Sequence, residues 1–166
     1  AERKWVETLN RKVVDVILEN KKWEFFVIEE NDPLDFHFIG WWIEEWDTEL
    51  ETVFKEVAEE SWYNDIEVIW AIERTYFYSQ GFRHTKQKNQ RTWGKFFYAK
   101  LLSESKISSE IDDWHHKWRW VKKEDVSDLI TWEAHLSAWN IFSQWLKAFT
   151  EYWKLINSWD FDGLAS

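Results

Sequence analysis

The chain has 166 residues and a formal net charge of −10, and it combines 16 tryptophans with no cysteine, no methionine and one proline. A hydrophobic content of 45% excludes intrinsic disorder, and the absence of cysteine excludes disulfides, thiolate metal ligands and a cysteine nucleophile. No stretch reaches the roughly 18 consecutive apolar residues of a membrane span, and residues 1–5 show no apolar signal core. We therefore expect one domain over residues 1–166, in the cytoplasm and without membrane contact. The skewed composition is also typical of an engineered scaffold.

The N-terminal segment carries apolar residues at helical spacing. Trp5, Leu9, Val13 and Ile17 recur at every fourth position, which places them on one face of a helix. The pattern predicts an amphipathic helix over residues 2–19.

A second helix is predicted over residues 33–60. Asp32 and Pro33 are typical of a helix start, because aspartate can accept hydrogen bonds from free N–H groups and proline has no N–H to satisfy. Apolar residues then follow in alternating steps of three and four, which is the spacing of a heptad seam. This seam would bury Trp46 and Leu50 in the core.

The C-terminal half has the same periodicity. Apolar residues alternate in steps of four and three over residues 106–121, and a longer apolar stripe begins at Leu129. Asp125 or Ser127 is a suitable N-cap for this last stripe. We predict one helix over residues 106–121 and a final helix that ends near residue 157.

Residues 62–102 fit two patterns. Their apolar positions form a helical stripe, but between Ile66 and Tyr78 apolar and polar residues also alternate as in a strand. Helix is favoured because the flanking segments are helical and glycine and proline are scarce, and Thr92 is a suitable cap for a helix up to Leu102. The predicted fold is an all-α antiparallel bundle of four or five helices, with an α+β fold containing strands within residues 62–102 as the alternative.

A basic segment interrupts the acidic chain, because no aspartate or glutamate occurs from Arg74 to Ser103. Lysine and arginine can neutralise phosphates, and aromatic rings can stack on bases. The acidic remainder of the chain argues against nucleic acid, so an acidic protein surface or a second copy of the chain is the better partner. The simpler interpretation is a solvated loop that balances the acidic body. The candidate partner-binding residues within segment 81–100 are Arg83, Lys86, Lys88, Arg91 and Trp93.

Two tryptophans are candidates for self-association. Trp41 and Trp120 lie off the main apolar stripes of their predicted helices. Exposed aromatic rings often mark a contact surface. The alternative role for the tryptophans is to fill the core, and we favour it for the others.

A metal site is weakly indicated at residues 112–116. Asp112 with His115, and Asp113 with His116, are each three residues apart and would share one face of a helix. A solvated surface pairing of these side chains is the simpler interpretation. We therefore expect no bound cofactor, and the metal assignment stays open.

Catalysis is the less favoured alternative. Glu73 lies on an apolar stripe, where burial would disfavour its charged form, and His84 or His135 could act with it as acid and base. The chain carries no Gly-rich phosphate loop and no Gly-x-Ser-x-Gly or His-Glu-x-x-His motif, which argues against common nucleotide hydrolases and zinc proteases.

The sequence alone thus favours a non-enzymatic structural or protein-interaction bundle. The first alternative is a binding module for an anionic partner through segment 81–100. The second is a bundle that holds a metal or a planar cofactor.

Overall fold

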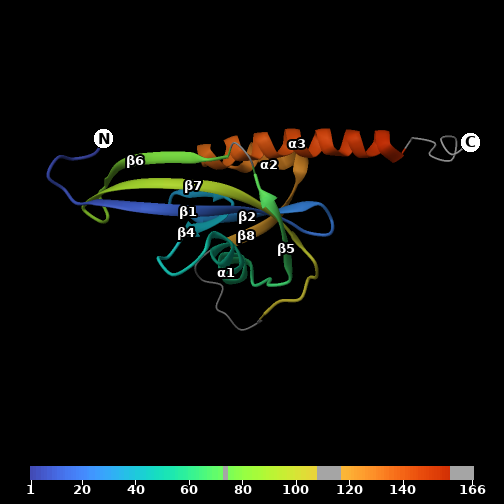
Figure 1. Cartoon of the computed structure of the whole chain (residues 1–166), viewed down its shortest axis with the longest axis horizontal. Helices are drawn as coiled ribbons and strands as arrows, with labels where there is room; N and C mark the ends of the chain where they lie inside the picture. Colours follow the sequence, from blue (N-terminus) through green and yellow to red (C-terminus); the bar gives the residue numbers. More distant parts are fainter. Residues whose placement is uncertain (73–74, 108–116, 158–166) are drawn as a thin grey trace, which may run out of the picture.

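In the computed structural model the chain forms a mixed α/β fold, with one sheet and helices on both of its faces (Figure 1). The structure describes residues 1–72, 75–107 and 117–157. The strands are β1 (Thr8–Glu19), β2 (Glu24–Asn31), β3 (Leu34–His37), β4 (Ile39–Trp42), β5 (Ile66–Ala71), β6 (Phe77–Arg83), β7 (Lys88–Leu101) and β8 (Lys117–Lys122), and the helices are α1 (Glu49–Ser61), α2 (Lys123–Leu129) and α3 (Glu133–Asn157). The predicted all-α bundle is therefore wrong.

The sheet is organised around β1 and β7, which pair in parallel over their whole common length. On its other edge, β7 pairs antiparallel with β6 through its first half and with β5 through its second half. β1 and β2 pair only beside their connection, where Glu19 lies opposite Phe25. Beyond that point β1 pairs with β4, whereas β2 pairs with β3 and β8. The sheet therefore divides into two arms that diverge from the β1–β2 connection.

Each face of the sheet has its own core. On one face, Val53 and Val57 of α1 pack against Val14, Val16 and Leu18 of β1. On the other, the first half of α3 and the short α2 cover the sheet (Figure 1). The residues buried in this second core include Ile17, Phe25, Val27, Phe38, Phe96, Tyr98, Val126, Trp139 and Phe142.

The predicted helix over residues 2–19 is a strand, and the physical reason lies in its burial. Residues Val14–Glu19 are all buried, because β1 lies in the centre of the sheet between two helical layers. A strand that is covered on both faces is a continuous apolar run without alternation. Apolar residues in such a run also fall on one face of a helix. Periodicity therefore cannot distinguish a buried strand from an amphipathic helix.

The predicted helix over residues 33–60 is divided into β3, β4 and α1. Asp32 and Pro33 lie in the turn between β2 and β3 rather than at a helix start. The helix begins after Thr48, whose hydroxyl accepts a hydrogen bond from the Glu51 N–H while the Glu51 carboxylate accepts one from the Thr48 N–H. Trp46 and Leu50 are exposed by 77% and 50%, so the predicted core positions are also wrong.

The remaining predictions hold only in part. Residues 62–102 contain β5, β6 and β7, as in the α+β alternative, but the sheet extends far beyond that segment, and the predicted helix from Thr92 to Leu102 lies within β7. Of residues 106–121, the described end is strand β8. The final helix is present as α2 and α3, with a break at residues 130–132.

In the described parts of the chain, no helix is long and apolar enough to span a membrane.

Candidate active site

A cavity of about 590 Å³ lies where the two arms of the sheet separate. Residues from β1, β2, β3 and β4 line it, and α1 contributes Glu60. Trp132, Glu133, Ala134 and His135 line it from the start of α3. Because the arms diverge, one cavity reaches both the end of α1 on one face and the beginning of α3 on the other.

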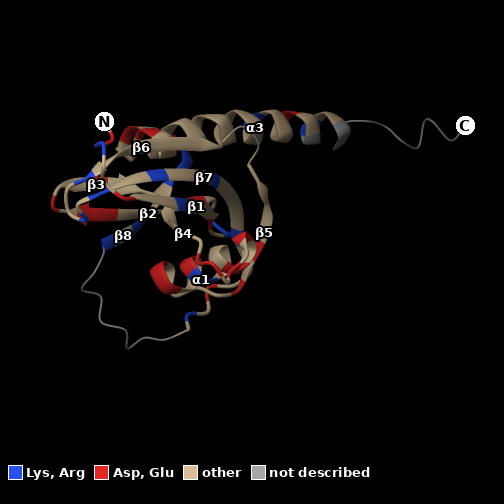
Figure 2. Cartoon of the chain, turned by 60° about the vertical axis from the view of Figure 1, so that its left-hand side comes forward, with Lys and Arg blue, Asp and Glu red and all other residues tan. Residues whose placement is uncertain are grey.

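Three carboxylates follow one another in the last turns of α1. Glu59 and Glu60 lie three and four residues after Glu56, which places both next to Glu56 on the helix surface. Figure 2 shows the acidic residues concentrated on α1. Glu60 lines the cavity, and Glu56 is only 3% exposed. The helix ends at Trp62, which adopts the left-handed backbone conformation with φ 63°.

The electrostatics of this row depart from those of a solvated helix face. The pKa of Glu56 is raised to about 7, mainly by burial and also by the negative charges of neighbouring glutamates, while the charge of Lys55 offsets part of the shift. A buried carboxylate beside like charges is costly unless a cation balances it.

The donor chemistry of this row fits a hard divalent cation. Carboxylate oxygens are the ligands of Mg²⁺ and Ca²⁺. Among the described residues, no group of three or more histidine, aspartate and glutamate side chains already has the spacing of a metal site. Mg²⁺ does not require such a group, because it usually takes one or two carboxylates together with water and substrate phosphates. Glu56, Glu59 and Glu60 are the residues that would hold it.

Aromatic rings and cations surround the opening of the cavity. The rings of Trp41 and Trp42 lie 4.0 Å apart between centroids, and both line the cavity. Arg83 lines it as well. The guanidinium of Arg11 and the ammonium of Lys86 lie 4.6 Å and 5.0 Å from the Trp42 ring centre. Positive charge therefore gathers near Trp41 and Trp42, in the cavity that Glu60 of α1 also lines.

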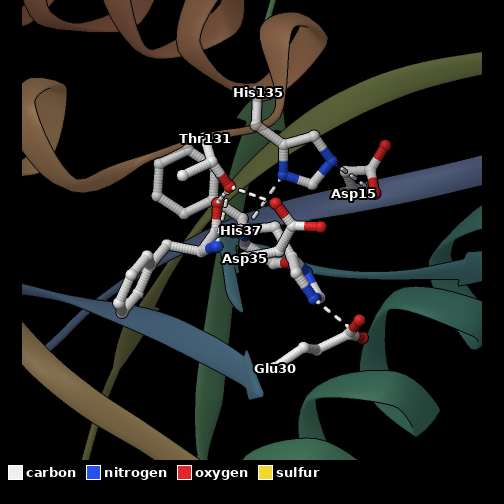
Figure 3. Close-up of polar contacts among 8 residues, drawn as sticks. Asp15, Glu30, Asp35, His37, Thr131 and His135 are labelled. Atoms are coloured by element: carbon white, nitrogen blue, oxygen red, sulfur yellow. Dashed lines mark hydrogen bonds and ion pairs between the residues drawn. The ribbon is translucent and has the colours of Figure 1, made fainter. Parts of the chain in front are cut away.

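The α3 end of the cavity holds a polar network (Figure 3). The Phe38 N–H donates to His135 Nδ1 at 3.0 Å, and His135 Nε2 lies 3.5 Å from Asp15 Oδ1. His37 stacks on Trp132 with a centroid distance of 3.9 Å. Its two ring nitrogens lie 2.8 Å from the Phe38 carbonyl and 3.1 Å from Glu30 Oε1. Two histidines and two carboxylates from separate elements thus meet at one end of the cavity.

The structure pairs much of the basic segment with acids from elsewhere in the chain. Arg91 binds both carboxylate oxygens of Glu2, at 2.7 Å and 3.0 Å, and Lys88 lies 2.7 Å from Glu7. Trp93 is 44% exposed. Of the predicted partner-binding residues in the segment, only Arg83 lines the cavity, and Lys86 lies over the adjoining Trp42.

The other predicted residues are dispersed. Trp41 is 43% exposed at the cavity, whereas Trp120 is half-buried and packs edge-on against Phe26. His135 lies in the cavity, but His84 packs against Phe82, away from it. The predicted partner Glu73 and the metal candidates Asp112, Asp113, His115 and His116 lie outside the described residues.

Sequence reasoning missed the acidic row of α1, although a signal was present. A capping box at Thr48 and Glu51 marks a helix start, and Glu-x-x-Glu-Glu follows within the same helix. Acidic residues on a helix are ordinary in a chain with 31 of them. Only the burial of Glu56 distinguishes the row from a solvated helix face. That burial can be seen in the three-dimensional structure but not in the sequence.

Gly40 provides space beside the cavity, and its replacement by alanine is expected to destabilise the protein by about 1–3 kcal/mol, the usual cost of overpacking. An added Cβ would collide with Asp15 Oδ1 and would lie 3.2 Å from the Val14 carbonyl oxygen. Gly81→Ala is the matched control, because nothing lies within 4 Å of a Cβ built there. Urea unfolding of both variants is the measurement, and equal midpoints would contradict the expectation.

Residues 9–140 match the family model of the NUDIX domain. Because the match spans most of the chain, the chain belongs to the NUDIX domain family. No protein of curated function matches its sequence significantly.

Solved structures show the same fold. A C. elegans Ap4A hydrolase is 18% identical, with a TM-score of 0.56, and the match covers 83% of this chain and 99% of that one. The E. coli dihydroneopterin triphosphate pyrophosphohydrolase is 16% identical, with a TM-score of 0.59, and the match covers 79% and 93%.

These findings correct the predicted function. The chain is a member of the NUDIX domain family with a mixed α/β fold and not a helical scaffold, and this membership conflicts with a de novo designed bundle. The sequence lacks the phosphate-loop and serine-hydrolase motifs, but their absence does not argue against this family. The candidate site is instead made from glutamates of one helix.

Proposed function

We propose that this protein hydrolyses a diphosphate linkage in a small nucleotide-like molecule with the help of a divalent cation. The observation that carries the proposal is that Glu60, in the acidic row of α1, lines the same cavity as the tryptophans and Arg83. NUDIX enzymes act on small-molecule substrates. A cavity of about 590 Å³ is within the range of roughly 300–1,000 Å³ that is typical of small-molecule sites.

Each part of the cavity matches one part of such a substrate. Glu56, Glu59 and Glu60 would hold the cation, which neutralises charge on the phosphate oxygens and lowers the pKa of the attacking water. Arg83 can bind phosphate oxygens through its planar guanidinium. Trp41 and Trp42 provide flat apolar surfaces, as small-molecule sites generally do. Glu60, Arg83 and the two tryptophans line one cavity, and Glu56 and Glu59 belong to the same helix as Glu60.

The test is hydrolysis of nucleoside triphosphates and diphosphate-linked nucleotides in the presence of Mg²⁺, measured by release of phosphate or pyrophosphate. Glu59→Gln and Glu60→Gln each keep the side-chain shape and remove a negative charge. We expect each to lower kcat/KM by about 10²-fold or more, in the range of removing a group that acts in the transition state. Removal of the cation with a chelator should have a similar effect.

Glu151→Gln is the matched control. It makes the same chemical change on the exposed part of α3, outside the cavity-lining residues, and should leave hydrolysis unchanged. Hydrolysis that survives both the α1 substitutions and chelation would contradict the proposal.

A further inference from the structure

Asp15 is the buried polar residue whose hydrogen bonding the fold leaves incomplete. It is 3% exposed in the centre of β1, and it lines the cavity. Its Oδ2 is the buried side-chain oxygen or nitrogen without a hydrogen-bond partner among the described residues. A buried acceptor without a donor costs free energy that a ligand donor can recover. The residue therefore points to a ligand with N–H or O–H groups.

The surroundings of Asp15 keep it an acceptor. His135 Nδ1 accepts the Phe38 N–H, so a neutral His135 carries its proton on Nε2, the atom that faces Asp15 Oδ1 (Figure 3). Asp15 Oδ1 thereby has a donor partner within the protein, and Oδ2 has none. Opposite Asp15 on β4 stands Gly40, where any side chain would collide with this carboxylate. The local fold makes room for an unpaired carboxylate oxygen at the cavity wall.

A flat aromatic surface lies beside this carboxylate. Trp132 stacks on His37 with an interplanar angle of 13°, and both residues line the cavity. Both ring nitrogens of His37 contact oxygen atoms, which holds the plane of the ring in place. The indole is also 39% exposed. Trp132 and Asp15 line the same cavity and both lie close to His135, so a planar heterocycle stacked on the indole would lie on the same side of the cavity as the carboxylate.

We propose that this end of the cavity recognises a nucleobase with a guanine-type edge. Guanine presents two adjacent donors, its N1–H and its 2-amino group, and a carboxylate can accept from both. Adenine presents a ring-nitrogen acceptor beside its amino group, and that lone pair would face the negative charge of Asp15. The inference rests on the proposed function, because it assigns the base of the substrate whose phosphates reach α1.

The test uses nucleosides, which carry no phosphate and need no cation. Guanosine, inosine and adenosine are titrated into the unmodified protein, and tryptophan fluorescence reports binding because Trp41 and Trp132 line the cavity. Guanosine should bind about tenfold or more tightly than adenosine, in line with the discrimination of a two-point base contact. Inosine keeps N1–H but lacks the 2-amino group, so its affinity should be intermediate. Equal affinities, or tighter binding of adenosine, would overturn the proposal.

Asp15→Asn tests the residue itself. The amide keeps the shape but replaces one acceptor oxygen with a donor, so the preference for guanosine should fall about tenfold while adenosine binding does not weaken. Asp65→Asn, on an exposed residue outside the cavity-lining set, should leave both affinities unchanged. An unchanged preference in a folded Asp15→Asn variant would overturn the assignment, and if that variant does not fold, the nucleoside series decides.

The two proposals fail in different ways. A guanosine preference without any hydrolysis would refute the proposed function and leave the base site standing. Hydrolysis that treats guanine and adenine nucleotides alike would refute the base site and leave the function standing.

Discussion

Replacing Glu56 by glutamine is expected to stabilise the metal-free protein at pH 8 and to abolish its hydrolytic activity. The pKa of Glu56 is raised from its ordinary value of 4.5 to about 7 by burial and by neighbouring carboxylates. At pH 8 the side chain is charged in the folded protein, where that charge is disfavoured. Glutamine has nearly the same shape and no charge, so the folded state gains stability while a cation ligand is lost.

The sign and the pH window follow from linkage. Because the pKa is higher in the folded state than in the unfolded state, the folded state binds the proton more tightly. This contribution is fully present below pH 4.5, falls as pH rises, and is lost above about pH 7. Allowing for solvent screening, we expect the free energy of unfolding of Glu56→Gln to exceed that of the unmodified protein by roughly 1–3 kcal/mol at pH 8. At pH 4 the two free energies should differ little.

Chemical unfolding at pH 4 and pH 8, without a divalent cation, measures this effect. In the presence of Mg²⁺ the difference in unfolding free energy between Glu56→Gln and the unmodified protein should be smaller. A cation that binds only the folded state stabilises the unmodified protein by mass action. Glu151→Gln is again the control, and its stability relative to the unmodified protein should not change with pH or with Mg²⁺. A Glu56→Gln variant that is less stable at pH 8 than the unmodified protein would show that the carboxylate is balanced within the fold.

Phe142→Ala is expected to cost about 3–5 kcal/mol, the usual range for truncating a buried phenylalanine. Phe142 is fully buried, and its ring lies 4.7 Å from the Tyr98 ring and 5.9 Å from the Phe25 ring between centroids. It also contacts Trp139 one turn earlier in α3. The substitution therefore opens a cavity at the point where α3 joins β2 and β7.

Leu50→Ala is the contrasting variant. Leu50 is 50% exposed in the first turn of α1, so its truncation should change the free energy of unfolding by no more than about 0.5 kcal/mol. Urea unfolding of the two variants side by side makes the comparison. Similar midpoints would mean that the second core, beneath α3, contributes little to stability.

Loss of Phe142 should also weaken the candidate site. His135 lies two turns before Phe142 in the same helix and lines the cavity. Undocking α3 from the sheet would therefore displace the imidazole that faces Asp15. The second core and the proposed base site are coupled because α3 contributes residues to both.

Some features of this protein could be predicted from local sequence. The apolar stripe from Leu129 predicted a long C-terminal helix, and α3 is that helix; the apolar residues of its first half pack on the sheet. The capping box at Thr48 and Glu51 is equally local, and it marks the start of α1 more reliably than Asp32 and Pro33 do. Both signals, the stripe along the helix and the capping motif at its start, lie within the element that they mark.

The strands could not be assigned from pattern alone. β1 is covered by α1 on one face and by α3 on the other, so the alternation that identifies a strand is absent. The basic segment was visible in the sequence, but its pairing with Glu2 and Glu7 depends on the register of β1 beside β7. Long-range pairing, which no local window contains, decided both.

The sequence by itself determined the ingredients of this protein: a buried apolar segment, a capped acidic helix, a long amphipathic helix and an excess of large aromatic rings. The tertiary structure decided which of them meet. Asp15, His37, Glu60 and His135 come from four elements spread over most of the chain, and they line one cavity because the sheet divides after Glu19. Burial then separates Glu56 from ordinary surface glutamates, since the same carboxylate in water would keep its ordinary pKa.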